Sequence, residues 1–232
     1  MNRTHTNADM SHQNTFAYKL GEVKESIRIF GLKKTLQKIL RQIYYHYKGI
    51  DFETENIFNL TRTGEYVDHG TALVSTSYDF FLQVMGDLEA ILEKPLSKRL
   101  FLDYGSGKGG AIIQARKYGF EEAIGVEFAK ELHEIAESNI RKLSLDRIKS
   151  VWADATEFEP PKETTLIYLF NPFDAVVMER VAERIKKAKE LFDSEVYLVY
   201  GNPSCDEVLE KRFEKLRFIT YPTGARVSFY RV

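Results

Sequence analysis

The sequence predicts an α/β fold in which helices cover both faces of a mostly parallel β-sheet. After Pro95, short apolar runs alternate with stretches in which apolar residues recur every three or four positions. Such alternation of strands and helices is typical of a parallel sheet with both faces buried. The last two apolar runs are joined by Pro222-Thr223-Gly224, which favours a turn and predicts an antiparallel strand pair at one edge.

Two helices are expected before the sheet begins. From about residue 21 to residue 48, apolar residues keep helical spacing and predict an amphipathic, basic helix. Residues 49–76 are polar and contain glycine, which predicts an irregular segment, and a second helix is expected over 77–93. The apolar stripe of the first helix consists of Leu32, Leu36, Ile39, Leu40, Ile43 and Tyr47.

Seven strands and four more helices are expected in the remainder of the chain. We therefore expect a disordered leader over 1–20, a helical extension with a lid over 21–94, and the sheet domain over 95–232. The strands are predicted at 99–104, 123–128, 148–153, 165–170, 195–200, 216–221 and 226–232, and the helices at 111–118, 130–143, 174–192 and 206–213.

Composition excludes several classes of function. The 232 residues carry a net charge of −1, so the whole molecule does not attract a polyanion by bulk electrostatics. Cys205 is the single cysteine, which excludes a disulfide within the chain and a cysteine-rich zinc site. The five histidines show no metal-ligand spacing, and no apolar run is long enough to span a bilayer. We expect no metal, no transmembrane segment and a cytoplasmic location.

A glycine-rich loop, Gly105-Ser106-Gly107-Lys108-Gly109-Gly110, follows the first predicted strand. Ligands of open α/β sheets bind beyond the carboxyl ends of the strands, where this loop lies. Its glycines satisfy the G-x-G-x-x-G pattern of dinucleotide sites, and Glu127 follows at the end of the second strand. The same loop suits S-adenosylmethionine, whose sulfonium and amine are cationic and favour neighbouring carboxylates.

Three features favour S-adenosylmethionine over a dinucleotide. Asp103 precedes the loop, where many dinucleotide sites carry apolar residues, and is placed to meet the amino group of the ligand. Asp154 follows the third strand, where an adenine amino group is expected. Asn171-Pro172-Phe173 follows the fourth strand and places an amide beside an aromatic ring. A nicotinamide enzyme would also need a substrate domain, for which little chain remains.

The motifs DYGSGKGG, GVEF, ADA, LFNPF and VYGNP resemble the class I, seven-stranded, Rossmann-like S-adenosylmethionine-dependent methyltransferases, in particular small bacterial members of unassigned substrate. The resemblance covers about residues 60–232. It departs from the N-P-P-Y motif of the nucleic-acid enzymes that methylate amino groups, because a single proline is followed by Phe173.

The resemblance implies a role for each motif. Asp103 and the glycine loop would line the methionine part of the cofactor, and Asn171 would orient an acceptor nitrogen together with Tyr66 or Tyr78. Apart from the resemblance, the segment 60–80 precedes the first strand and is polar, aromatic and irregular, so we expect it to fold over the cofactor as a lid. The implied cofactor-binding residues are Asp103, Gly105, Ser106, Gly107, Lys108 and Gly109 at the methionine side, Glu127 at the ribose, Phe128, Asp154 and Ala155 at adenine, and Asn171, Pro172 and Phe173 beside the methyl group.

The sequence leaves the methyl acceptor open. A protein side-chain amine such as lysine is slightly favoured, a small molecule is nearly equal, and a nucleic acid comes third because the charge balance gives it no broad support. A nicotinamide-dependent oxidoreductase and a non-catalytic S-adenosylmethionine-binding module remain as alternatives. The basic helix over 21–48 presents either a solvated face or a surface for an acidic partner, RNA or anionic lipid.

Overall fold

A computed structural model describes residues 21, 23–28, 31–52, 61 and 77–232, which fall into two compact units, Met1–Ile50 and Asp51–Val232. The leader expected over 1–20 and most of the lid expected over 60–80 lie outside the described residues. The domain boundary expected at residue 94 stays a prediction; helix α3 (Tyr78–Leu92) belongs to the second unit.

The first unit corrects the prediction of one continuous helix over 21–48. Residues 23–28 are helical, but helix α2 begins only at Leu32 and runs to Lys48. Gly31 precedes it with φ 79°, a left-handed conformation that cannot continue a right-handed helix. Thr35 is buried, and its hydroxyl lies 3.1 Å from that of Ser26, so the two helical pieces pack together around a polar contact.

The second unit contains the predicted seven-stranded sheet, and each strand forms within two residues of its expected bounds. The strand order is β3-β2-β1-β4-β5-β7-β6. Strands β1 to β5 pair in parallel, whereas β7 runs antiparallel to both β5 and β6. The strands are β1 (Leu100–Tyr104), β2 (Glu122–Glu127), β3 (Ile148–Trp152), β4 (Thr164–Phe170), β5 (Tyr197–Gly201), β6 (Glu214–Thr220) and β7 (Arg226–Arg231).

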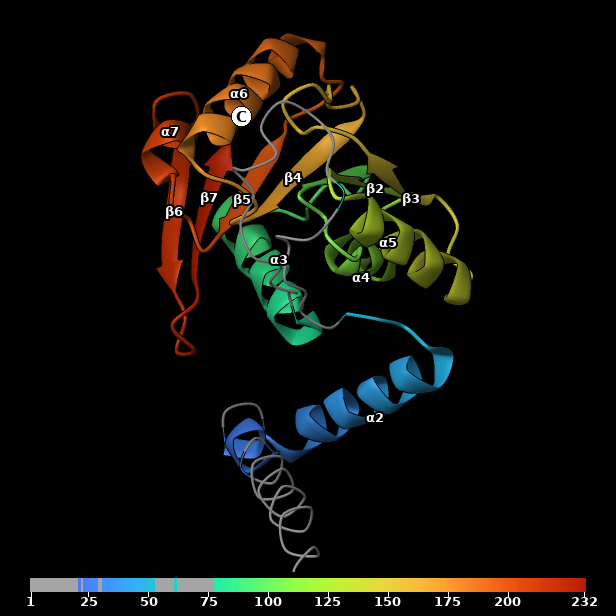
Figure 1. The fold of residues 1–232 in the computed structure, drawn as a ribbon. Coiled ribbons are helices and arrows are strands. Elements are labelled where there is room, and N and C mark those ends of the chain that lie inside the picture. Colours follow the sequence, from blue (N-terminus) through green and yellow to red (C-terminus); the bar gives the residue numbers. More distant parts are fainter. Residues whose placement is uncertain (1–20, 22, 29–30, 53–60, 62–76) are drawn as a thin grey trace, which may run out of the picture. The chain divides into compact units, whose positions relative to one another are not determined.

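Helices cover both faces of this sheet (Figure 1). One face packs against α6 and α7, and the other against α3, α4 and α5. The last two predicted helices are shorter than expected, because α6 gives way to a 3₁₀ turn, η3, and α7 ends at Glu210. The remaining bounds are α4 (Gly110–Tyr118), α5 (Lys130–Lys142), α6 (Ala175–Ala188), η3 (Lys189–Leu191) and α7 (Asp206–Glu210).

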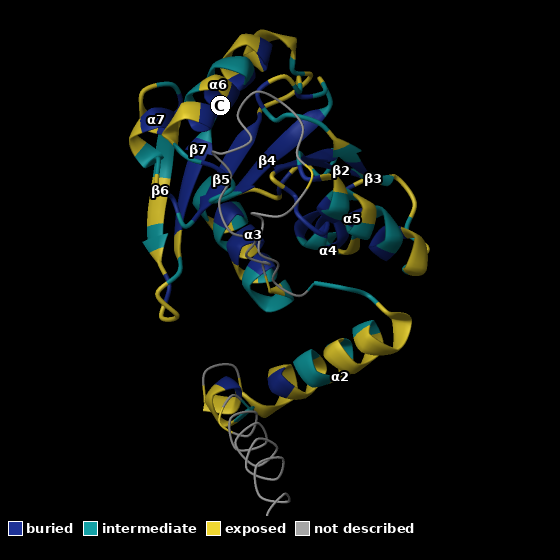
Figure 2. Cartoon of the chain, in the orientation of Figure 1, coloured by how far each residue is buried: buried dark blue, intermediate teal, exposed yellow. Residues whose placement is uncertain are grey.

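Alternation along the strands explains why two cores form. In β1, Phe101 faces the α3 side, whereas Leu100, Leu102 and Tyr104 face the α6 side, and every residue of the strand is buried. The central strands are buried throughout, and only β6 at the edge is mostly exposed (Figure 2). Burial on both faces accounts for the continuous apolar runs of the sequence.

The strand order fixes where a ligand can bind. From β1 the chain moves through β2 to β3 in one direction, and β4 and β5 lie in the other. The carboxyl ends of β1 and β4 therefore flank the switch point at which open α/β sheets bind ligands. In the part of the chain that the structure describes, no helix has both the length and the apolar character needed to cross a membrane.

Candidate functional site

The loop after β1 depends on glycine. Gly105, Gly107 and Gly109 have φ values of 81°, 54° and 81°, which other residues rarely adopt. A β-carbon on Gly105 would lie 2.3 Å from Cβ of Pro172, so the loop packs directly on the segment that follows β4. The two predicted motifs, the glycine loop and Asn171-Pro172, are thus in contact at the switch point.

Glu127, the last residue of β2, is buried and turns back to the glycine loop. One carboxylate oxygen accepts the Gly107 N–H at 2.8 Å, and the other accepts the Ala129 N–H at 2.9 Å. Burial raises the pKa of Glu127 to about 7, although the backbone N–H groups favour the ionised form. Each oxygen keeps a second lone pair for a ligand hydroxyl.

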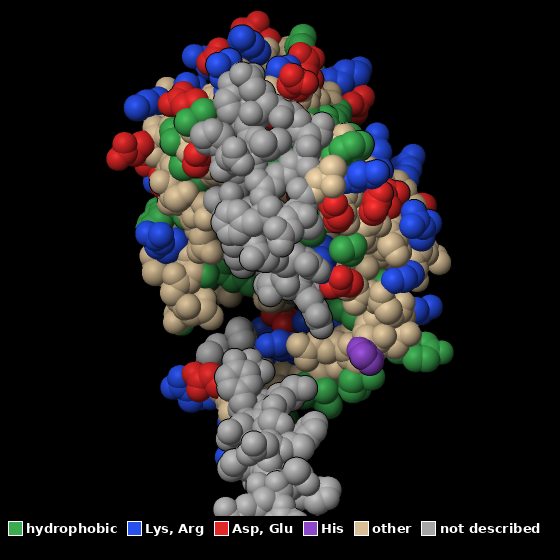
Figure 3. Space-filling view, viewed as in Figure 1, with side chains coloured by type: hydrophobic (Ala, Val, Ile, Leu, Met, Phe, Trp, Pro, Cys, Tyr) green, Lys and Arg blue, Asp and Glu red, His purple; other side chains and the backbone are tan. Residues whose placement is uncertain are grey.

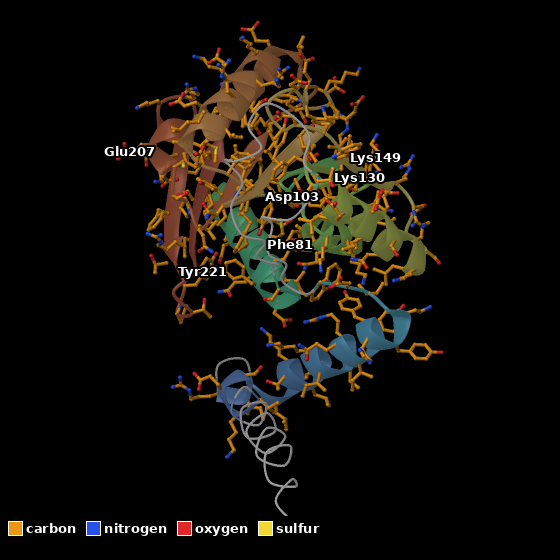
Figure 4. The ribbon with its side chains drawn as sticks, viewed as in Figure 1. Phe81, Asp103, Lys130, Lys149, Glu207 and Tyr221 are labelled. Carbon is orange, nitrogen blue, oxygen red and sulfur yellow. The ribbon has the colours of Figure 1, made fainter. Side chains whose placement is uncertain are left out.

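Asp103 lies in β1 beside Glu127 and has a different environment. Its side chain is buried, and no hydrogen bond or ion pair joins it to another described residue. Burial, and then the charge of Glu127, raises the pKa of Asp103 well above its usual range. Figure 4 shows Asp103 in the middle of the sheet domain. Two buried carboxyls without a basic partner in the described structure form a site that a cationic ligand would complete.

Lys108, which the resemblance placed at the cofactor, is buried and directed elsewhere. Its ammonium lies 2.7 Å from a carboxylate oxygen of Asp51. Asn139 of α5 joins this pair, because its amide donates to the carbonyl oxygens of Asp51 at 2.8 Å and Lys108 at 3.1 Å and accepts the Asp51 N–H at 3.0 Å. The three residues connect the glycine loop, α5 and the segment before α3. Sequence reasoning missed Asp51 and Asn139.

The residues expected at adenine gather beyond β2 and β3. Trp152 is half-exposed, and its indole N–H donates to the carbonyl of Phe128 at 3.0 Å. Asp154 accepts the N–H of Thr156 at 2.8 Å, which shapes the turn after β3. Ala155 packs on the core beneath that turn. Phe128, Asp154 and Trp152 therefore border one region at the carboxyl edge of the sheet.

Asn171, Pro172 and Phe173 follow β4 as expected but point in different directions. Asn171 adopts φ 46°, and its amide oxygen accepts a hydrogen bond of 2.7 Å from the hydroxyl of Ser204. Phe173 is buried in the core under α6, so its ring supports the loop from below. Sequence reasoning missed Ser204, although the VYGNP motif that precedes it was noted; Asn202 in that motif repeats the left-handed conformation, with φ 48°.

The comparisons with known proteins agree with this geometry. A family model described as a methyltransferase domain matches residues 97–217, more than half of the chain. This chain belongs to the methyltransferase-domain family. It is a class I methyltransferase, and its cofactor is S-adenosylmethionine. No curated protein matches the sequence.

Solved structures share the fold of this methyltransferase at low sequence identity. An RNA methyltransferase from Salinibacter ruber in complex with S-adenosyl-L-homocysteine has a TM-score of 0.52 and 18% identity, over 68% of this chain and 94% of that chain. A Pyrococcus abyssi tRNA (uracil-54, C5)-methyltransferase in complex with the same compound has a TM-score of 0.52 and 16% identity, over 78% and 44%. The PH0226 protein from Pyrococcus horikoshii OT3 has a TM-score of 0.51 and 14% identity, over 66% and 91%.

Of the two tyrosines expected near the acceptor of this methyltransferase, the structure describes only Tyr78. Tyr78 is the first residue of α3 and is half-buried, and Tyr66 lies outside the described residues. Tyr200 of β5, which the sequence did not single out, is linked to Asn171 through Ser204, because its hydroxyl is 3.4 Å from that of Ser204; it also accepts the Cys205 N–H at 3.3 Å. Among the residues that the structure describes, no cluster of His, Cys, Asp and Glu could hold a metal ion.

The pair of Asp51 and Lys108 predicts an asymmetry between two substitutions. Asp51→Ala removes a partner of the buried Lys108 ammonium and is expected to lower the free energy of unfolding by about 2 kcal/mol. The expected loss is smaller than for a fully buried ion pair, because Asp51 is partly exposed. Lys108→Met replaces the ammonium with apolar volume and is expected to cost less than about 1 kcal/mol. Urea unfolding of both variants measures the difference. A larger loss for Lys108→Met would contradict this account of the pair.

Proposed function

We propose that this methyltransferase transfers the methyl group of S-adenosylmethionine to an amine, with a protein side chain such as lysine as the first candidate. One observation supports the position of the cofactor site. Asp103 and Glu127 are buried near the carboxyl ends of β1 and β2, and the charge of Glu127 acts on Asp103. No basic side chain of the described structure pairs with either carboxyl group. The sulfonium and ammonium groups of the cofactor supply the missing positive charge. The left-handed glycine loop leaves room for its backbone to approach a ligand.

The proposed cofactor contacts follow the course of the three strand ends. Asp103 would hold the amino group, and Glu127, fixed by Gly107 and Ala129, would accept hydrogen bonds from both ribose hydroxyls. Phe128 would pack on adenine, whose edge would meet Asp154 and Ala155. The loop residues Gly105, Ser106, Gly107, Lys108 and Gly109 would enclose the methionine part, and Asn171, Pro172 and Phe173 would form the floor beside the methyl group.

Ser106 and Lys108 have indirect roles in this proposal. The hydroxyl of Ser106 is buried and has no hydrogen-bond partner among the described residues, and a β-carbon on Gly125 would lie 2.5 Å from it. Ser106 therefore packs the loop onto β2. Lys108 fixes the loop through Asp51. Both residues would shape the backbone that contacts the ligand. Asp103, and neither of these two, would pair with the positive charge of the ligand.

The acceptor would lie between the ends of β4 and β5. The bound cofactor supplies an electrophilic methyl group with a neutral thioether as its leaving group. The Ser204 hydroxyl donates to the amide oxygen of Asn171 and so fixes the amide beside the position proposed for the acceptor. An amine attacks only when neutral, and Asn171 offers a hydrogen-bond acceptor without adding a negative charge that would favour the ammonium form. Alignment of this kind contributes up to about 7–11 kcal/mol.

Other acceptors receive less support from the molecule. The RNA methyltransferase and the tRNA methyltransferase among the structural neighbours share only the fold with this chain, at 18% and 16% identity. The net charge is −1, and basic and acidic side chains alternate over the described surface around α6 (Figure 3). A polyanion acceptor would favour a basic surface beside the site.

The cytoplasmic location expected from the sequence stays a prediction.

Glu127→Ala tests the cofactor site. Loss of the hydrogen bonds to two ribose hydroxyls is expected to weaken S-adenosylhomocysteine binding by about 100-fold, which corresponds to about 3 kcal/mol. Glu122→Ala is the matched control, because Glu122 begins the same strand at the opposite edge of the sheet and should leave affinity unchanged. Calorimetry measures both. Equal affinity of the two variants, or binding of NAD in preference to the sulfur nucleoside, would refute the site.

Asn171→Ala tests the acceptor. A cell extract is incubated with the enzyme and methyl-labelled cofactor and then fractionated into protein, RNA and metabolites. We expect label in the protein fraction, on an amine, and an initial rate about 10- to 100-fold lower for Asn171→Ala at saturating cofactor, because alignment is lost. S-adenosylhomocysteine affinity should not change. Label confined to RNA or to metabolites would assign another acceptor class and refute a protein side chain as the acceptor.

A further inference from the structure

Helix α2 carries an apolar stripe that the described structure does not cover. Leu32, Leu36, Leu40, Ile43 and Tyr47 succeed one another at spacings of three and four residues and therefore lie on one face. Their exposed fractions lie between 54% and 84%, whereas the apolar faces of α3 and α6 are buried against the sheet. Figure 2 shows α2 exposed along most of its length. Contiguous exposed apolar surface of this kind indicates an interaction site.

The charges of α2 are all of one sign. The helix contains five basic residues and no Asp or Glu, although the whole chain is nearly neutral. Lys33 lies beside the apolar stripe, and the other four basic residues lie toward the opposite side of the helix. The five basic residues are Lys33, Lys34, Lys38, Arg41 and Lys48.

The combination of an apolar stripe and a basic polar face restricts the partner. RNA would use the cations but leave Leu36, Leu40 and Ile43 without an apolar partner. A second copy of α2 could cover the stripe but would offer the cations no acidic partner, because the helix contains no Asp or Glu. An anionic bilayer satisfies both features, because its acyl region takes the stripe and its headgroups pair with the cations.

We propose that α2 binds the surface of an anionic lipid bilayer. The helix lies in the plane of the interface, with Leu36, Leu40 and Ile43 inserted below the headgroups. The long side chain of Lys33 keeps its ammonium group at headgroup level while its methylenes follow the apolar boundary, and the other cations face the headgroups from the polar side of the helix. Because the five stripe residues share one face, they reach the surface together when the helix lies flat. At 1.5 Å per residue the helix is about 25 Å long. This inference is independent of the methyl acceptor.

Sedimentation of the full chain with vesicles tests the proposal. We expect binding to vesicles of phosphatidylcholine mixed with phosphatidylserine, little binding to phosphatidylcholine alone, and weakening at high salt because the charges are screened. A double substitution, Leu36→Glu with Leu40→Glu, and a second one, Lys33→Glu with Lys34→Glu, should each reduce the bound fraction about tenfold or more. Leu191→Glu is the matched control, because Leu191 is an exposed leucine in the second unit.

The outcomes separate lipid from the other partners. Retained S-adenosylhomocysteine affinity shows that the second unit of each variant is folded, unchanged helical circular dichroism shows that α2 is folded, and the charge-reversal pair keeps the test available if the leucine pair does not fold. Equal binding of wild type to neutral vesicles, or loss of binding in Leu191→Glu, would overturn the proposal. It would also fall if wild type bound no vesicle, or if the lipid-free wild type were a dimer that Leu36→Glu with Leu40→Glu converts to a monomer.

Discussion

The burial of two neighbouring carboxyl groups at the ends of β1 and β2 is the constraint on which the site depends. Folding raises the pKa of Glu127 from 4.5 to about 7, mainly through burial, which corresponds to about 3 kcal/mol against the ionised form. The folded chain holds the proton on Glu127 more tightly than the unfolded chain does. The contribution of Glu127 to the free energy of unfolding therefore falls as pH rises from 4.5 to about 7. The glycine loop offsets part of this penalty through the Gly107 N–H. A cationic ligand, such as the proposed cofactor, would remove more of this penalty.

The sequence predicts most of this arrangement because the signals are local. Strands buried on both faces appear as apolar runs, so the order of strands and helices can be followed from Leu100 onward. Only glycine tolerates the left-handed positions of the loop after β1 at no steric cost, so Gly105, Gly107 and Gly109 mark that loop directly. Acids that directly follow apolar runs, such as Glu127, fall at the carboxyl edge of a parallel sheet.

The remaining features depend on contacts between residues far apart in the chain. Nothing near Lys108 indicates that its ammonium pairs with Asp51, since that contact exists only once α5 brings Asn139 beside both. The hydroxyl of Ser204 meets Asn171 because β4 and β5 are neighbours. Gly31 interrupts the N-terminal helical pattern, but isolated glycines also occur inside helices, as Gly86 does in α3. Sequence spacing alone does not distinguish the two cases.

The proton balance of cofactor binding tests the central claim most directly. Calorimetric titration with S-adenosylmethionine at a pH of about 6.5, in two buffers with different ionisation enthalpies, measures how many protons leave the enzyme. If the cofactor completes a site made by Asp103 and Glu127, both carboxyls ionise on binding and protons are released, so affinity rises with pH. Binding without proton exchange, or with proton uptake, would show that the buried carboxyls do not meet the positive charge of the cofactor and would contradict the account.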